Sequence, residues 1–119
     1  MATGSPEPSR GQVWLVRFGA SDPGEPGKNR PAIIVSIDSL RTGSERDLFV
    51  VVPISATEPG SQMRPPVAPA DAGVDRPSIA VPAAVRAVSR ARLLRHIGGV
   101  SVDTLQAVEQ VLAVVLGLD

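Results

Sequence analysis

The segment Glu25–Ile37, with the sequence EPGKNRPAIIVSI, joins a turn-rich loop to a short apolar strand. Glycine, proline and asparagine crowd its first half, so residues 19–29 are expected to form a mobile loop. Its second half, Ala32–Ile37, is an apolar run that suits a buried strand. Between the two, Pro31 fixes its own φ and disfavours a helical conformation for Arg30. We therefore expect Arg30 to be held extended where the loop enters the core.

Several other short segments have the composition of strands. They are β-branched, apolar or aromatic, and glycine, proline or polar turns bound them. Besides residues 32–37, the predicted strands are Gln12–Phe18, Leu48–Ile54, Val67–Ala70, Ser78–Val81, Val85–Val88 and Arg92–Ile97. Trp14 and Phe18, both in the first of these strands, are expected to pack in the core. Short strands at this spacing favour a small barrel or sandwich over βαβ units.

The end of the chain has a different periodicity, which predicts an amphipathic helix. Ser101 is a suitable N-cap, Asp103 suits the first turn, and Gly117 is placed to end the helix. Apolar residues follow helical spacing at Val102, Leu105, Val108, Val111, Leu112 and Val115. The predicted fold is therefore mainly β with a C-terminal α-helix, one face of which seals the barrel. A helix used only for dimerisation is the alternative.

The length and composition indicate one domain, residues 10–119, after a flexible polar tail, residues 1–9. The chain has no cysteine, which excludes disulfides and thiolate chemistry and agrees with a reducing cytoplasm. It has no apolar run of about 18 residues, so no membrane-spanning helix is expected. Its start lacks the charged and apolar regions of a secretory signal.

The charges are balanced overall but unevenly distributed. The formal net charge is zero, which argues against a protein that coats polyanions generally. Residues 76–102, however, contain five arginines, the single histidine His96 and no carboxylate. A basic face on a neutral protein fits a local footprint for an anion or a nucleic acid. A solvated surface of strands and loops explains the same charges equally well.

No motif of common enzyme classes is present. Metal-ligand spacings of His, Asp and Glu, phosphate-binding loops and nucleophile elbows are all missing. Two places remain as candidate sites. One is Arg30, whose guanidinium would be mounted rigidly to contact a phosphate. The other is Ser55, at the end of a predicted buried strand, where a hydroxyl could donate to a phosphate oxygen. Alternatively, Arg30 pairs with a surface carboxylate and Ser55 caps a turn.

The order of these features resembles the MazF/PemK (Kid) group of toxin endoribonucleases. The shared features are RGQVWLVRF at residues 10–18, EPGKNRP at residues 25–31, two apolar strands of which the second ends in PIS, and the final helix. The resemblance covers about residues 10–117. It implies a small SH3-like barrel of the CcdB/PemK type that forms a homodimer. RNA would lie in grooves across the dimer interface.

The resemblance also implies an activity, that of an mRNA interferase in a type II toxin–antitoxin system. Such an enzyme cleaves single-stranded RNA at short sequences without a metal or other cofactor, leaves a cyclic phosphate and a 5′-hydroxyl, and inhibits translation and growth. A cognate MazE-like antitoxin would block the RNA groove with a disordered acidic tail. By position, the family's key arginine falls on Arg30, its hydroxyl residue on Ser55 and its loop glutamate on Glu25. Many members carry Asp-Gln where this chain has Ala83-Ala84, which leaves the proton-transfer partner open.

The chemistry assigns roles to these residues. A 2′-hydroxyl attacks its own phosphate, so Arg30 would stabilise the transition state, Ser55 would donate a hydrogen bond and Glu25 would act as the base, with His96 and Glu58 in reserve. RNA contacts are expected from Lys28, Asn29, Thr57, Arg86 and Arg90. Two alternatives stay open: a gyrase-poisoning toxin of the same fold, and a catalytically weak barrel that only binds a partner.

Overall fold

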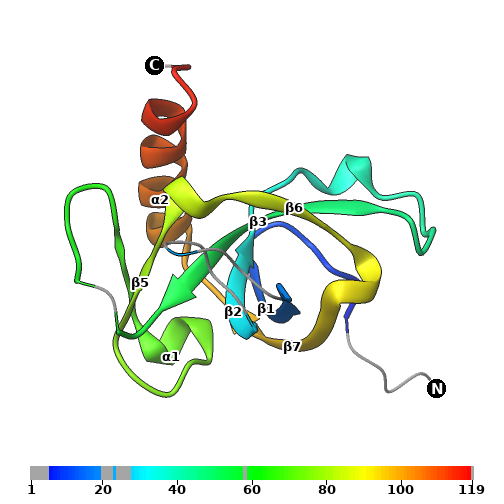
Figure 1. Ribbon diagram of the computed structural model, residues 1–119, viewed down its shortest axis with the longest axis horizontal. Coiled ribbons are helices and arrows are strands. Elements are labelled where there is room, and N and C mark those ends of the chain that lie inside the picture. Colours follow the sequence, from blue (N-terminus) through cyan, green and yellow to red (C-terminus); the bar gives the residue numbers. More distant parts are fainter. Residues whose placement is uncertain (1–5, 20–22, 24–27, 58, 119) are drawn as a thin grey trace.

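The computed structural model describes residues 6–19, 23, 28–57 and 59–118, and in this part a curled sheet dominates (Figure 1). The strands are β1 (Gln12–Arg17), β2 (Asn29–Ile34), β3 (Leu48–Ser55), β4 (Pro66–Val67), β5 (Ser78–Ala80), β6 (Arg86–Ser89) and β7 (Leu93–Gly99). The helices are α1 (Pro69–Ala72), α2 (Val102–Val115) and the short 3₁₀ turns η1 (Asp38–Leu40), η2 (Pro82–Ala84) and η3 (Arg90–Arg92). The mainly β fold with a C-terminal helix is confirmed.

The sheet curls because β3 pairs with different strands along its length. Its order is β4-β5-β3-β2-β1-β7, and all pairings are antiparallel. The first half of β3 pairs with β6, whereas its end pairs with β5. The η3 turn then links β6 to β7 at the other edge of the sheet, which brings the two edges round into a half-barrel (Figure 1).

Two apolar clusters lie on opposite faces of this sheet. Trp14, Val16, Phe18, Ala32, Ile34, Phe49, Val51 and Val88 fill the inside of the curl. Val13, Ile33, Val35, Val52, Ile54, Val67, Ala72, Ala80 and Val108 lie between the sheet and the helices. Successive side chains of a strand point to opposite faces, so a strand that is covered on both faces is apolar throughout. This accounts for the unbroken apolar runs of β2 and β3, and it confirms that Trp14 and Phe18 are core residues.

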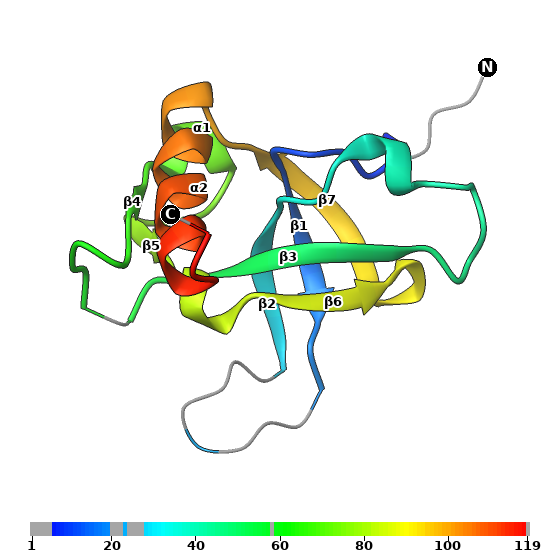
Figure 2. The same cartoon turned by 90° about the horizontal axis from the view of Figure 1, so that it is seen from above.

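The C-terminal helix forms as its sequence predicts. Ser101 is the N-cap, and its Oγ accepts a hydrogen bond from the backbone N–H of Thr104 at 3.2 Å. Gly117 has a φ of 69°, and the backbone N–H of Leu118 donates to the carbonyl of Ala113 at 2.8 Å, which is the Schellman arrangement. Val108 is fully buried, and Leu105 and Leu112 pack against the same cluster. The helix therefore covers one face of the sheet, on the side where α1, β4 and β5 also lie (Figure 2).

Each of the seven predicted strands differs from the observed strand in at least one bound, and two differ most. The strand predicted for residues 32–37 is β2, which begins at Asn29 and ends at Ile34, because the hairpin with β1 extends the pairing back into the loop. The strand predicted for residues 67–70 ends at Val67, and α1 begins at Pro69. Proline is pre-organised for the first turn of a helix, and this preference overrides the apolar composition there.

Part of the N-terminal segment contacts the rest of the domain. Residues 1–5 lie outside the described part of the chain, but residues 7–9 are bound to the body of the domain. The Glu7 carboxylate pairs with Arg90 at 2.7 Å, and Arg41 donates hydrogen bonds to the carbonyl of Pro8 and to Ser9 Oγ at 2.7 and 2.8 Å. Two arginines distant in sequence thus contact residues 7–9, whereas the sequence predicts a flexible tail over residues 1–9.

The Arg10-Gly11 pair joins three parts of the fold. The backbone N–H of Arg10 donates to Asp38 Oδ1 at 2.7 Å, and its guanidinium pairs with Glu109 of α2 at 2.8 Å and donates to the carbonyl of Val35. Gly11, with a φ of 89°, hydrogen-bonds through its backbone to Ile34 and Val100. Arg10 and Gly11 therefore connect the start of β1 to the end of β2 and to the final helix.

Candidate functional site

A pocket of about 290 Å³ opens where β2 begins, β3 ends and the connection from α1 to β5 passes. It is lined by Lys28, Asn29, Arg30, Pro31, Ile54, Ala56, Thr57, Val74, Asp75, Arg76 and Ser78. Three of these residues are cations, and several others carry amide or hydroxyl groups. The size lies at the lower end of the range for small-molecule pockets, about 300–1,000 Å³. The structure thus brings Arg30, Lys28, Asn29 and Thr57 of the sequence-predicted site to one cavity.

Arg30 is the second residue of β2 rather than the residue before the strand. It lies opposite Val16 of β1, and Ala32, two residues further along β2, lies opposite Pro53 of β3. If that register is continued by two residues, Arg30 faces Ser55. Residues opposite each other in an antiparallel pair share a face of the sheet. Arg30 and Ser55 therefore sit side by side at the same end of the sheet, although Ser55 itself is not part of the pocket wall.

Ser55 is buried behind the pocket and connects to it through Thr57. It is 7% exposed and lies opposite Ile79 of β5, so it ties the end of β3 to the neighbouring wall. Its Oγ accepts a hydrogen bond from the backbone N–H of Thr57 at 3.3 Å and lies 3.4 Å from Thr57 Oγ1. Thr57 is exposed and lines the cavity. A phosphate in the pocket would meet the Thr57 hydroxyl before the Ser55 hydroxyl.

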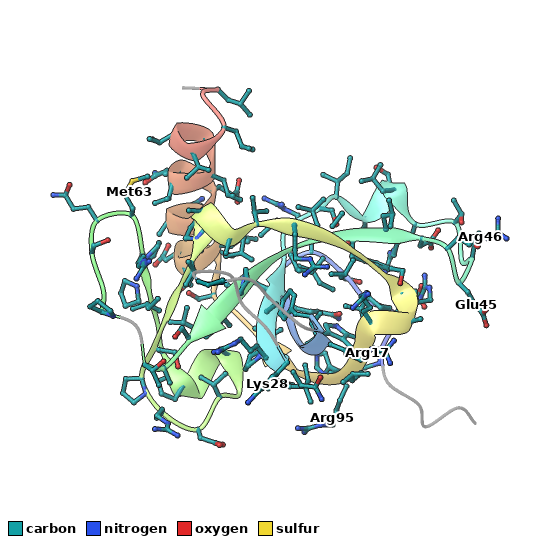
Figure 3. The ribbon with its side chains drawn as sticks, viewed as in Figure 1. Arg17, Lys28, Glu45, Arg46, Met63 and Arg95 are labelled. Atoms are coloured by element: carbon teal, nitrogen blue, oxygen red, sulfur yellow. The ribbon has the colours of Figure 1, made fainter. Side chains whose placement is uncertain are left out.

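Lys28 enters the pocket from a strained backbone position. Its φ is 60°, in the left-handed region, where a residue with a Cβ pays about 1–2 kcal/mol. Two hydrogen bonds hold it there: its N–H donates to the carbonyl of Gly19 at 2.7 Å, and its carbonyl accepts from the N–H of Phe18 at 2.8 Å. The side chain is exposed at the loop end of the β1–β2 hairpin, next to the pairing of Asn29 with Arg17, and Figure 3 labels both cations. Strain of this kind clusters at functional sites.

Arg86 lies at the same end of the barrel as Arg30 but outside the pocket. It is opposite Val51 of β3, in the inner face of the curl. Its guanidinium lies over the Phe18 ring, 5.4 Å from the centroid, and donates to the Phe18 carbonyl at 3.4 Å. The side chain is largely exposed, so it can contact a ligand that extends beyond the pocket.

Arg90 is not brought to the Arg30 site. It sits next to Asp47, which precedes β3, whereas Ser55 ends that strand. Seven residue steps of a strand separate the two ends, roughly 23 Å. The guanidinium pairs with Glu7 at 2.7 Å and with Asp47 at 2.9 Å and stacks on the Phe49 ring at 5.3 Å. These contacts raise the pKa of Arg90 and make it a structural residue.

Asp47, which the sequence did not single out, is the centre of that structural cluster. It is buried, and its carboxylate accepts hydrogen bonds from the Thr42 hydroxyl at 2.5 Å, from the backbone N–H groups of Thr42 and Gly43, and from Arg90. The bond from Thr42 and then that from Arg90 hold the pKa of Asp47 far below its usual range. A carboxylate with this many donors is a loop anchor, not a proton acceptor.

The other candidate bases are placed less favourably or not at all. Glu25 and Glu58 lie outside the described residues. His96 is partly buried on β7 and makes an edge-to-face contact with the Trp14 ring, with centroids 5.6 Å apart. Ala83 and Ala84 form part of η2, which packs against α2. Among the described residues, no three His, Asp or Glu side chains gather as a metal site, and no helix is long and apolar enough to cross a bilayer.

One wall of the pocket was missed by the sequence analysis. Val74, Asp75 and Arg76 belong to the connection from α1 to β5, a stretch without a motif or a strand pattern. They reach the pocket because β5 pairs with the end of β3, directly beside Ser55. A pairing between strands more than twenty residues apart leaves no local signal, so only the tertiary structure places these residues.

Comparisons with known proteins agree with this fold. A family model of PemK-like, MazF-like toxins of type II toxin–antitoxin systems matches residues 9–116. MazF from Deinococcus radiodurans is 19% identical, with a TM-score of 0.79 over 95% of this chain and 99% of that one. An endoribonuclease in complex with its cognate antitoxin from a mycobacterial species is 21% identical, with a TM-score of 0.76 over 95% and 98%. The Mycobacterium tuberculosis toxin MazF-mt6 is 20% identical, with a TM-score of 0.73 over 91% and 98%.

These structures share the fold of the chain, and the family model matches nearly its whole length. The curled sheet and the C-terminal helix are thus features of a known fold. This chain belongs to the family of PemK-like, MazF-like toxins of type II toxin–antitoxin systems.

Proposed function

We propose that this chain is a metal-independent endoribonuclease that cleaves single-stranded RNA and thereby inhibits translation and growth. The observation that carries the proposal is the pocket in which Arg30 and Lys28 lie beside the Thr57 hydroxyl, with Ser55 behind it. Cations and hydroxyl donors in one cavity suit a phosphodiester. Proteins of this family with known structures include endoribonucleases, which supports the same activity here.

The reaction needs little from the protein beyond positioning and electrostatics. The 2′-hydroxyl of the substrate attacks the adjacent phosphorus, the bond to the 5′-oxygen breaks, and a 2′,3′-cyclic phosphate and a 5′-hydroxyl result. Arg30 binds the scissile phosphate and stabilises the charge that grows on its oxygens. Thr57 and Ser55 donate hydrogen bonds on the same side. The base predicted from the sequence, Glu25, lies outside the described residues, so the pocket geometry does not bear on it.

The proposal extends to partners. RNA beyond the scissile phosphate would contact Lys28, Asn29 and Arg86, which lie at the same end of the barrel. Arg90 is left out, since two carboxylates already bind it. A cognate antitoxin with an acidic tail would compete for these cations, in line with the neighbour solved with its antitoxin. The chain would act as a homodimer in the cytoplasm, and the exposed apolar side chains at the end of α2 fit contact with a second copy.

The test is cleavage of a single-stranded RNA library by the purified chain in EDTA, with the ends of the products mapped. We expect cyclic phosphate and 5′-hydroxyl ends at a short preferred sequence. Arg30→Ala should abolish cleavage, because the transition-state charge loses its closest cation. Ser55→Ala should slow cleavage less, because Thr57 still supplies a hydroxyl.

The matched control is Arg46→Ala. Arg46 is exposed on the turn before β3, at the opposite end of the sheet from Lys28 (Figure 3). The substitution removes one positive charge, as Arg30→Ala does, but at a residue that does not line the pocket, so cleavage should stay at the wild-type level. Cleavage by folded Arg30→Ala at the wild-type rate would refute the assigned role of Arg30. An inert wild-type chain would refute the ribonuclease proposal; gyrase inhibition by that chain would point to a poison of the same fold, and no inhibition to a barrel that only binds.

A further inference from the structure

The connection from α1 to β5 holds a carboxylate rigidly at the pocket. At one end of it, Gly73 adopts a φ of 75° and lies so close to β7 that a Cβ there would sit 2.5 Å from the carbonyl oxygen of Ile97. At the other end, Ser78 is buried, donates a hydrogen bond to the Arg76 carbonyl at 2.9 Å and begins β5. Asp75 lies between these two anchors. The segment is therefore fixed on both sides of Asp75.

The direction of this segment is set by its neighbours. Val74 packs against the apolar cluster that includes Ile54 and Ala72. Asp75 and Arg76 are exposed and line the cavity together with Arg30 and Thr57. In the part of the chain that the structure describes, no hydrogen bond or ion pair holds the Asp75 carboxylate. It is thus available to a ligand in the pocket.

The other carboxylates whose side chains are described are committed or distant. Glu7 and Asp47 bind Arg90, Glu109 binds Arg10, Asp38 accepts a hydrogen bond from the backbone of Arg10, Asp103 lies in the first turn of α2, and Glu45 lies on the turn before β3. Asp75 is the one carboxylate of this set that lines the cavity with Arg30. A proton acceptor in the cavity of the phosphate-binding arginine can therefore come from the connection between α1 and β5.

We infer that Asp75 is the general base of RNA cleavage in this chain, an assignment that rests on the proposed ribonuclease activity. Arg30 holds the scissile phosphate from β2, and Asp75 faces it from the connection between α1 and β5. A nucleotide between the two walls presents its phosphate to the arginine and its ribose to the carboxylate. The positions Ala83 and Ala84, which carry no acid here, play no part in this arrangement.

The step balances without a cofactor. The Asp75 carboxylate takes the proton of the 2′-hydroxyl as the 2′-oxygen forms its bond to phosphorus. The bond from phosphorus to the 5′-oxygen breaks, and the leaving oxygen takes a proton from water in the open pocket. The protonated Asp75 then returns its proton to the hydroxide or to solvent. General base assistance of this kind contributes about 10²–10⁴-fold to a rate.

The experiment measures single-turnover cleavage of one RNA oligonucleotide as a function of pH and RNA concentration. Asp75→Asn keeps the size of the side chain and removes the base. We expect the maximal rate to fall by at least about 10²-fold, with a smaller change in the RNA concentration at half-saturation. The acid limb of the pH–rate profile should disappear, because it reports ionisation of the base. Asp75→Glu should restore part of the rate and the acid limb.

Two further variants make the outcome decisive. Asp103→Asn removes an exposed carboxylate in the first turn of α2 that does not line the pocket, and this variant should cleave like the wild type. Glu25→Gln removes the rival base and should keep the acid limb. The inference is overturned if Asp75→Asn cleaves at the wild-type rate with its acid limb intact, or if it changes only the cleaved sequence. Loss of the acid limb in Glu25→Gln instead would overturn it too. A wild-type chain that fails to cleave RNA would refute the proposed function itself, a result distinct from all of these.

Discussion

Gly98→Ala probes the close contact between β7 and α1, the helix that precedes the pocket residues Val74–Arg76. Gly98 lies in β7, and a Cβ there would sit 2.6 Å from the carbonyl oxygen of Ala72 and 2.8 Å from its carbonyl carbon. Both atoms are backbone of α1, so no side chain can turn aside. Ordinary contacts begin at about 3.4 Å, so the two backbones must separate by about 0.8 Å, the difference between 3.4 and 2.6 Å. The substitution therefore pushes α1 off the sheet.

The loss of stability follows from the packing of α1 that this separation disturbs. Ala72 is fully buried and belongs to the cluster between the sheet and the helices. Overpacking of a well-packed contact costs about 1–3 kcal/mol. For a domain of this size each kcal/mol lowers the Tm by about 3–6 °C. We expect Gly98→Ala to be about 2 kcal/mol less stable, with a Tm lower by roughly 6–12 °C.

The neighbouring glycine provides the control. A Cβ at Gly99 would lie 3.5 Å from the carbonyl oxygen of Gly11, an ordinary contact, and its φ is not in the left-handed region. Gly99→Ala should therefore be neutral or stabilising by up to about 1 kcal/mol, because alanine restricts the unfolded chain. Thermal and urea unfolding of both variants measure the difference. Equal unfolding temperatures and urea midpoints for Gly98→Ala and Gly99→Ala would refute the argument that the close contact between α1 and β7 requires a glycine at position 98.

Three other substitutions test the loop anchor, the helix cap and the strained lysine. The pKa of Asp47 is lowered in the folded state, so its stabilising contribution is present above its ordinary pKa of 3.8 and is lost as pH falls below that value. Asp47→Asn should therefore unfold at a lower urea concentration than the wild type at pH 7 and lose less stability between pH 4 and pH 2. Equal losses of stability in the two proteins over that pH range would contradict this. Ser101→Ala should destabilise α2 by about 1 kcal/mol in thermal unfolding, because Thr104 loses its cap, and an unchanged Tm would show that the cap is dispensable. Lys28→Gly relieves the strain of the positive φ but increases the conformational entropy of the unfolded chain, so the free energy of unfolding should change by less than about 1 kcal/mol. RNA affinity should fall, and its salt dependence should weaken by about one phosphate contact. Equal RNA affinity in the variant and the wild type would show that Lys28 does not contact RNA.

The fold was largely predictable because its signals are local. The N-cap, the helical spacing and the final glycine of residues 101–117 determine α2 without help from the rest of the chain. The apolar runs at β2 and β3 likewise mark buried strands. Their bounds were less predictable, since pairing with β1 extends β2 back to Asn29, and Pro69 replaces a predicted strand end by a helix.

The candidate site was predictable only in part. Arg30 and Thr57 follow from the sequence because each lies at the end of an apolar strand. Arg90 has the same composition signal as Arg86, yet Glu7 and Asp47 bind it at the other end of the sheet. A charge read from sequence carries no information about its partner, and the partner decides whether it faces a ligand.

The sequence by itself determined the class of fold, the final helix and the extended arginine near the start of the second strand, since each depends on neighbours within a few residues. Only the tertiary structure decided what faces that arginine. Pairing of β5 with the end of β3, and the close glycine contacts between α1 and β7, bring Asp75 into the lining of the Arg30 pocket. Contacts between segments more than twenty residues apart arise from the closure of the whole sheet, and no local pattern encodes them.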